Sequence, residues 1–154
     1  MEALIQRVSK ASVEVEGSLI GRIGPGLLLF IGVGSNDTIE DVRYIADKVT
    51  GLRIFSDKEG KFNLSVLDTG GEVLVVSQFT LLADTRKGRR PGFTSAAPPE
   101  LAESLIDTLT GLIRDNGVRV ETGKFQAHMM LEIHNDGPVT IPIHSSDRLR
   151  PRKT

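Results

Sequence analysis

The stretch "GPGLLLFIGV" at residues 24–33 decides the fold of this 154-residue chain. Its apolar side chains run from Leu27 to Val33 without polar alternation, and glycine and proline precede them. Such a run, bounded by turn residues, predicts a strand that is buried on both faces. It is too short for a membrane span, which needs about 20 apolar residues.

The residues before this strand predict a β-hairpin. In a strand at residues 4–15, Val13 and Val15 alternate with Glu14, and Glu16 continues the alternation. The turn "EGS" follows at residues 16–18, and residues 19–23 form the returning strand.

Two amphipathic helices are predicted after it. Asp37 or Thr38 caps the first, an acidic residue three positions later completes a capping box, and Gly51 marks its end. The second begins at the proline pair 98–99 and stops at "NG", residues 116–117. Further strands are predicted at residues 52–55, 72–82, 118–122, 129–135 and 139–143, with a turn at 56–61.

Strands outnumber helices in this pattern, and short turns join most neighbours. The predicted fold class is therefore α/β of the α+β type, an antiparallel barrel-like sheet with two main helices packed alongside. No repeat or long linker divides the chain. Residues 1–145 are expected to form a single domain, and residues 146–154 a basic C-terminal tail.

Composition is that of an ordinary globular protein, with 39% hydrophobic and 25% charged residues and a net charge of −1. The absence of cysteine excludes disulfides and thiolate chemistry. The N-terminus lacks the basic start and apolar core of a secretory signal. We therefore expect a cytoplasmic protein without a membrane partner.

Positive charge gathers in two short segments. The first, named the basic loop from here on, comprises Arg86, Lys87, Arg89 and Arg90. It is either a solvated loop or a segment that contacts phosphate, since arginine binds phosphate in a bidentate manner. The second closes the chain as "RLRPRK" (148–153); it has no apolar periodicity and predicts a disordered basic extension.

The residues alone indicate neither a metal centre nor a standard nucleophile. His128 and His134 would lie roughly 20 Å apart in a straight strand, so no metal or other cofactor is expected. Ser77 and Thr80 stand where a buried strand ends, where they either face a pocket or satisfy backbone groups. Backbone N–H groups aimed at an oxyanion remain a further alternative, and they leave no trace in composition.

The stretch "HNDGPVTI" (134–141) has two interpretations. Asp-Gly favours a hairpin turn, which the residues alone support best. Pro138, however, withholds a ladder N–H, and Gly137 has no Cβ to keep another molecule away. A cis Gly-Pro bond, a form found in only about 5–6% of X-Pro bonds, would indicate a different role.

Two separated signatures, "SQFTL" (77–81) and "NDGPVT" (135–140), resemble those of the D-aminoacyl-tRNA deacylase family, also called D-tyrosyl-tRNA deacylases. "IQRV", "ADTRKGRRP", "AAPPELAE" and "VETGKF" support the resemblance, which extends to about residue 143. It implies a homodimeric ester hydrolase that releases a D-amino acid from D-aminoacyl-tRNA and rejects L-aminoacyl-tRNA. Glycyl-tRNA is expected to be cleaved as well, because excluding L side chains does not reject glycine.

The resemblance also implies a catalytic segment. It consists of Ser77, Gln78, Phe79 and Thr80. We expect backbone N–H groups near Phe79 and Thr80 to hold the carbonyl oxygen of the ester. A ribose hydroxyl of the substrate is expected to help activate water, so that Thr80 is not required as a nucleophile.

Substrate binding and chiral selection are implied at other positions. A cis Gly137-Pro138 dipeptide, followed by Val139 and Thr140, is expected to enter the pocket of the partner subunit, where its carbonyl groups obstruct an L side chain. Arg7 resembles the arginine that fixes this dipeptide. Phe125 and Met129 resemble the wall beside the adenosine, and the basic loop is expected to contact tRNA.

Two positions depart from the family pattern. Gly92 stands where serine is common, and Gln126 stands where glycine is common, close to the expected adenosine wall. Two other functions remain open. A non-enzymatic nucleic-acid-binding module would use the basic loop but not "SQFTL", and an esterase or lyase for a small metabolite would not use the basic loop.

Overall fold

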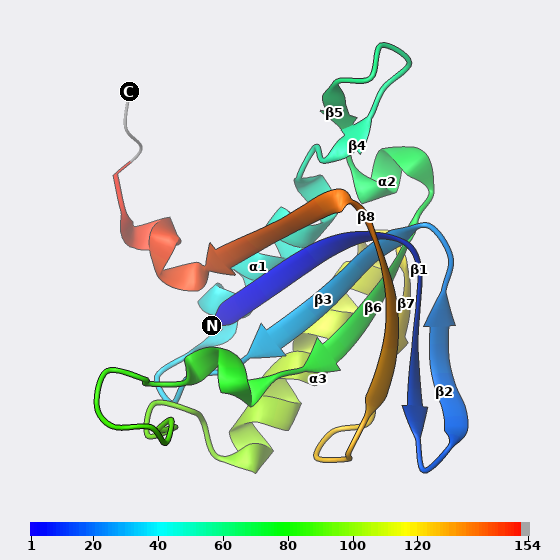
Figure 1. The fold of residues 1–154 in the computed structure, drawn as a ribbon. Helices are drawn as coiled ribbons and strands as arrows, with labels where there is room; N and C mark the ends of the chain where they lie inside the picture. Colours follow the sequence, from blue (N-terminus) through cyan, green and yellow to red (C-terminus); the bar gives the residue numbers. More distant parts are fainter. Residues whose placement is uncertain (152–154) are drawn as a thin grey trace.

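A curved six-stranded sheet organises the chain in this computed structural model, which describes residues 1–151 (Figure 1). The strand order is β2-β1-β3-β6-β7, and β8 pairs with the other side of β1. The strands of the sheet are β1 (Glu2–Val15), β2 (Ser18–Ile23), β3 (Gly26–Gly32), β6 (Glu72–Ser77), β7 (Arg119–Thr122) and β8 (Met130–His144). A separate hairpin, β4 (Phe55–Ser56) and β5 (Phe62–Leu64), projects from the body.

The stretch at residues 24–33 forms β3, and it is buried on both faces as predicted. Leu27 and Leu29 face the helices and belong to the larger core cluster. Leu28 faces the concave side of the sheet, where it joins Val13 and Leu74. Both faces of β3 are covered because this strand lies between β1 and β6 in the middle of the sheet. The helices pack on one face, and the curved sheet folds over the other.

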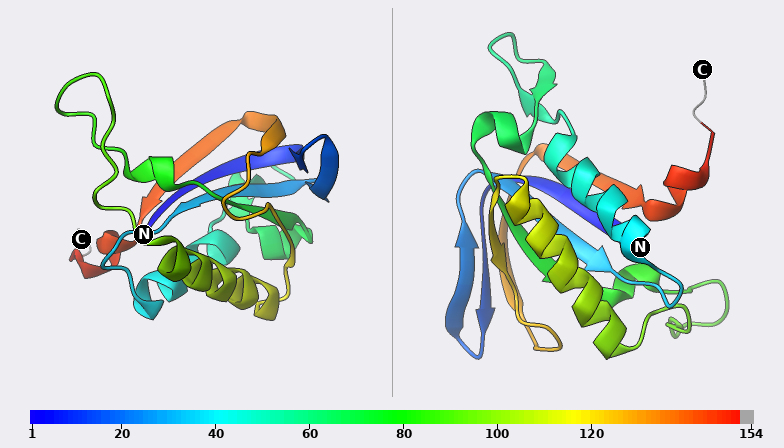
Figure 2. Two further views of the ribbon diagram at one scale, coloured as in Figure 1. Left: turned by 90° about the horizontal axis from the view of Figure 1, so that it is seen from below. Right: turned by 180° about the vertical axis from the view of Figure 1, so that it is seen from behind.

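The two main helices, α1 (Ile39–Gly51) and α3 (Pro99–Asp115), pack side by side on one face of the sheet (Figure 2, right). The short helix α2 (Val66–Thr69) precedes β6. On the other face, β1 and β8 bend, and β2 comes close to β7: a Cβ on Gly21 would lie 2.9 Å from the carbonyl oxygen of Thr122. The sheet is therefore nearly closed, like a barrel.

The predicted α/β class, barrel-like sheet and two main helices are confirmed, but the sheet is not purely antiparallel. β1 is antiparallel to β2, β3 and β8, whereas β3–β6 and β6–β7 are parallel pairs. Parallel neighbours cannot be joined by a tight turn and need a crossover. The chain between β3 and β6 contains α1, and the chain between β6 and β7 contains α3.

Three predictions for strands and turns are wrong. The strand predicted at residues 52–55 forms only at its last residue, where β4 (Phe55–Ser56) begins. The strand predicted at residues 72–82 ends at Ser77, and a 3₁₀ helix, η1 (Phe79–Leu82), follows it. The hairpin favoured at residues 136–138 does not form, because both flanking segments belong to β8 and pair with β1. Val8 pairs with Asn135 and Gln6 pairs with Thr140, so residues 136–139 bulge out of the ladder opposite Arg7.

The disordered extension predicted at residues 148–153 is wrong at its start, because residues 148–149 are helical. A second 3₁₀ helix, η2 (Ser145–Leu149), packs against α1 and the N-terminus. The Ser145 hydroxyl accepts a hydrogen bond from the N-terminal ammonium at 2.8 Å, and Arg148 Nε lies 3.3 Å from Asp41 Oδ1. Arg152 and Lys153 of the predicted tail lie outside the described residues.

Candidate active site

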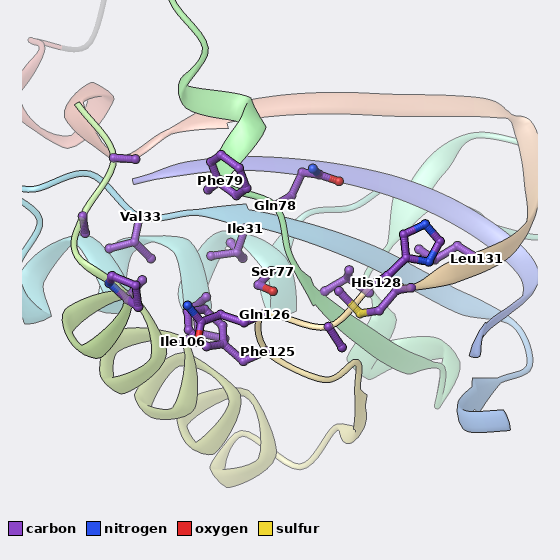
Figure 3. A pocket seen from close by; sticks show the side chains of 17 residues that line it. Ile31, Val33, Ser77, Gln78, Phe79, Ile106, Phe125, Gln126, His128 and Leu131 are labelled. Atoms are coloured by element: carbon purple, nitrogen blue, oxygen red, sulfur yellow. The ribbon is translucent and has the colours of Figure 1, made fainter. Parts of the chain in front are cut away.

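A pocket of about 630 Å³ opens where the parallel strands β3 and β6 end (Figure 3). Such carboxyl ends meet at one edge of a sheet, where ligands commonly bind in α/β folds. The other walls come from α3, the segment before it, and the connection between β7 and β8. The lining residues are Ile31, Val33, Val76, Ser77, Gln78, Phe79, Ala96, Ala97, Pro99, Ala102, Ile106, Phe125, Gln126, Ala127, His128, Met129 and Leu131.

Most of these walls are apolar, which suits an aromatic base or an apolar side chain. The lining has few polar side chains, namely Ser77, Gln78, Gln126 and His128. Phe79 is 58% exposed at the rim, and its ring meets that of Phe93 edge-to-face with a centroid separation of 5.0 Å. The pair forms an aromatic border on the side of the basic loop.

The predicted catalytic segment lies at the junction of β6 and η1. Gln78 donates its backbone N–H to the Ile31 carbonyl oxygen at 2.7 Å, which attaches the start of η1 to the end of β3. Gln78 Nε2 also donates to the hydroxyl of Thr80. Thr80 is exposed and does not line the pocket, and within residues 1–151 its side chain has no acidic or histidine partner.

Backbone N–H groups are available at this junction. The first N–H groups of a helix have no partner within the helix. Among the described residues, neither Phe79 nor Thr80 donates its backbone N–H to a partner outside η1. Two adjacent donors at the rim of a pocket could hold an oxyanion without any catalytic side chain.

The Gly137-Pro138 segment lies at the bend of β8, at the other end of the sheet from η1 (Figure 1). Its peptide bond is cis, and both residues are exposed. Gly137 has a φ of +129°, and a Cβ there would lie 2.9 Å from Val139 Cγ2 and 3.2 Å from Arg7 Nη2. Glycine is therefore required at this position.

Arg7 holds the bulge against the body of the protein. Its Nε donates to the carbonyl oxygen of Asp136 at 3.2 Å, and its Nη1 donates to the carbonyl oxygen of Ile54 at 2.8 Å. The guanidinium also lies over the Phe62 ring, 5.3 Å from its centroid. Inside the bulge, the Asn135 side chain is 2.9 Å from the Thr140 hydroxyl.

One chain therefore brings together only part of the predicted site. Ser77, Gln78, Phe79, Phe125 and Met129 line the pocket, whereas Thr80, Arg7 and residues 137–140 do not. The sequence did not predict the contribution of α3, whose Ala102 and Ile106 also line the pocket. The spacing of these residues is typical of a helix face that packs in the core, so the sequence did not distinguish them as pocket residues.

The basic loop comes soon after η1, whose Phe79 lines the pocket, and it extends from the body of the protein (Figure 2, left). Asp84 and Gly92 pair across its base, and its four cations are exposed. Arg86 Nη2 lies 2.7 Å from Asp84 Oδ2. The hydrogen bonds between them raise the pKa of Arg86 and lower that of Asp84.

Within residues 1–151 there is neither a cluster of metal ligands nor a membrane-spanning helix. No group of three histidine, aspartate or glutamate side chains in that part of the chain is placed to hold a metal ion. Nor does any described helix combine the length and apolar character that crossing a membrane requires.

Comparison with known proteins agrees with the geometry. The family model described as D-Tyr-tRNA(Tyr) deacylase matches residues 4–144. A D-aminoacyl-tRNA deacylase of Dehalococcoides mccartyi is 59% identical over 152 residues, covering 99% of each chain. One from Thermotoga petrophila is 58% identical over 146 residues, covering 95% of this chain and 98% of the relative.

Solved structures extend the likeness to three dimensions. The structure of a c-Myc DNA unwinding element binding protein matches with a TM-score of 0.88 and 40% identity, over 94% of this chain and 98% of that chain. A probable eukaryotic D-amino acid tRNA deacylase, 18% identical over 92% and 97% of the two chains, shares the fold with a TM-score of 0.78. The predicted family and the predicted enzyme class are both confirmed. The chain belongs to the D-Tyr-tRNA(Tyr) deacylase family.

Proposed function

We propose that this chain hydrolyses the ester that joins a D-amino acid to the terminal adenosine of tRNA. The observation that carries the proposal is the largely apolar pocket next to the start of η1, where Phe79 and Thr80 donate their backbone N–H groups to no partner outside η1 among residues 1–151. The curated relatives named D-aminoacyl-tRNA deacylase cover nearly the whole chain and support the same activity.

The reaction needs little from side chains. The ester carbonyl oxygen gains negative charge as water adds, and two preorganised N–H donors stabilise that charge. The adjacent ribose hydroxyl of the substrate assists the attacking water, while the pocket walls position the ester. Thr80 is not required as a nucleophile, because its hydroxyl accepts a hydrogen bond from Gln78 Nε2 and no base within residues 1–151 is bonded to it.

Selection against L-aminoacyl-tRNA is assigned to Gly137-Pro138 acting across a homodimer. Within one chain this dipeptide is exposed and distant from the pocket, and Arg7 holds its bulge in place. A second copy of the chain would bring the dipeptide to the pocket rim, with Val139 and Thr140 supporting it. Its carbonyl groups would then occupy the space of an L side chain but not that of a D side chain.

Two consequences follow from this form of selection. Glycyl-tRNA carries no side chain to exclude, so it is also cleaved. The basic loop, which extends from the body after η1, contacts phosphates of the tRNA near its acceptor end. The cytoplasmic location and the boundary between domain and tail stay predictions.

The activity is tested with three matched substrates. Purified protein is incubated with D-tyrosyl-tRNA, L-tyrosyl-tRNA and glycyl-tRNA, and release of the free amino acid is followed. We expect rapid cleavage of the D-tyrosyl ester, slower cleavage of the glycyl ester, and an intact L-tyrosyl ester. Equal cleavage of the D and L esters, or cleavage of neither, would contradict the proposal.

The contribution across subunits is tested by mixing two defective variants. Ala102→Trp fills the pocket but keeps the dipeptide, and replacing Gly137-Pro138 by Ala-Ala keeps the pocket. If the dipeptide excludes L side chains, homodimers of the Ala-Ala variant cleave both D-tyrosyl-tRNA and L-tyrosyl-tRNA. Refolding equal amounts together places half of the open pockets opposite an intact dipeptide, so cleavage of L-tyrosyl-tRNA falls by about half relative to the unmixed variants, while cleavage of D-tyrosyl-tRNA is unchanged. No fall in L-tyrosyl cleavage would place both parts in the same chain.

A non-enzymatic DNA-binding role is the second candidate, because a relative with 40% identity is described as a DNA unwinding element binding protein. This role would use the basic loop and leave the pocket without a ligand. Tight binding of duplex DNA combined with no deacylation would favour it.

A further inference from the structure

We propose that the Gln126 side-chain amide hydrogen-bonds the adenine base of the substrate's terminal nucleotide and thereby sets substrate affinity. This inference rests on the proposed function, because that function supplies the adenosine.

The backbone of Gln126 is unusual for a residue with a side chain. Its φ is +61°, in the left-handed region that favours glycine. It occupies the third position of a turn that the Ala127 N–H closes by donating to the Lys124 carbonyl oxygen at 3.2 Å. Glycine or asparagine is preferred at such a position, so the glutamine is held there at a cost in stability. Costs of this kind concentrate at functional sites.

The side chain lies at the pocket and is available to a ligand. Gln126 lines the pocket next to Phe125, on the side nearest α3 (Figure 3). It is exposed, and its amide forms no hydrogen bond with any residue in the described part of the chain. The other glutamine of the lining, Gln78, is already engaged with Thr80. Gln126 is thus the amide of the pocket that remains open to a substrate.

The chemistry of the amide matches one edge of adenine. Its oxygen accepts a hydrogen bond and its nitrogen donates two, while adenine presents the N6 amino donor beside a ring-nitrogen acceptor. A pair of bonds between them discriminates adenine from bases with other edges. The Phe125 ring and the apolar side chains Ala102 and Ile106 provide the surface against which a base can stack.

The test combines a side-chain change with a change in the base. Gln126→Met keeps the length and the left-handed backbone but removes the amide hydrogen bonds. D-tyrosyl-tRNA is prepared with a terminal adenosine or with purine riboside, which lacks the N6 amino group. For the wild type we expect KM to be about 3- to 10-fold higher with purine riboside, the effect of losing one or two neutral hydrogen bonds. For Gln126→Met, KM is raised by a similar factor with adenosine, and the two substrates become equivalent.

A second variant separates the amide from the backbone. Gln126→Gly should raise the midpoint of thermal unfolding by about 2–4 °C, because it removes the left-handed penalty, while raising KM as Gln126→Met does. A Gln126→Met enzyme that keeps the wild-type KM and still prefers adenosine would overturn the inference and leave the proposed function intact. A wild-type enzyme that fails to cleave D-tyrosyl-tRNA would overturn both.

Discussion

Replacing Asp41 by asparagine tests how the C-terminal segment is attached to the domain. Asp41 lies in the first turn of α1 and is only 6% exposed. Its Oδ2 accepts the backbone N–H of Thr38 at 2.8 Å, and its Oδ1 is 3.3 Å from Arg148 Nε. The carboxylate therefore links the start of α1 to η2.

The magnitude follows from the pKa of this carboxyl. Burial alone raises the pKa, but hydrogen bonds from Thr38, Ser145 and Arg148, together with the N-terminal ammonium, outweigh burial and lower the pKa from 3.8 to about 2. At about 1.4 kcal/mol per pH unit, this difference stabilises the folded state by roughly 2.5 kcal/mol. Because the folded pKa is the lower one, the stabilisation is present above pH 4 and is lost as the pH falls towards 2.

The measurement is urea unfolding of the wild type and Asp41→Asn at several pH values between 7 and 2. We expect the wild type to exceed the variant by about 2.5 kcal/mol at pH 7, and the two to converge near pH 2. Asp47→Asn, which changes an exposed carboxylate on the same helix, is the control and should differ from the wild type by less than about 0.5 kcal/mol. A wild-type advantage that stays constant from pH 7 to pH 2, or no advantage at pH 7, would refute the reasoning.

Three further predictions concern packing, catalysis and tRNA binding. Gly26→Ala should lower the free energy of unfolding by more than about 3 kcal/mol or abolish folding, because its Cβ would lie 1.9 Å from the Glu72 carbonyl oxygen. The control is Gly51→Ala, whose new Cβ has no atom within 4 Å. Circular dichroism should show that this control folds normally. Thr80→Ala should keep a substantial single-turnover rate with D-tyrosyl-tRNA, and complete loss of activity in a folded variant would contradict the backbone mechanism. Replacing the four cations of the basic loop by serine should weaken tRNA binding and reduce the slope of log K against log salt by about 3, whereas an unchanged slope would mean that the loop does not contact phosphate.

Local pattern was sufficient for elements whose structure depends on their own residues. The apolar run of β3, the capping residues before α1 and the prolines at the start of α3 each act within a few positions of the chain. The signatures at residues 77–81 and 135–140 were sufficient to identify the family. In contrast, the pocket needs α3, the β7–β8 connection and two strand ends in one place, and this arrangement has no local signal.

The bulge at residues 136–139 illustrates the limit most clearly. Asp-Gly favours a hairpin by itself, but the long strand β1 offers hydrogen-bonding partners to the residues on both sides of it. The ladder with β1 therefore outweighs the local turn preference, and Arg7 fixes the residues that bulge out. The local turn preference is worth a few tenths of a kcal/mol to about 1 kcal/mol, which is less than the combined contribution of the hydrogen bonds in a ladder of several residues.

The sequence by itself thus determined the class of fold, its two main helices and the family, because periodicity, capping and motif spacing are properties of short segments. Only the tertiary structure decided that β3, β6 and β7 are parallel. It also decided that Gly137-Pro138 lies away from the pocket of the same chain, and that Gln126 has a left-handed backbone conformation beside that pocket. These outcomes depend on contacts between residues far apart in the chain. Their energies compete with local preferences only once the strands have assembled.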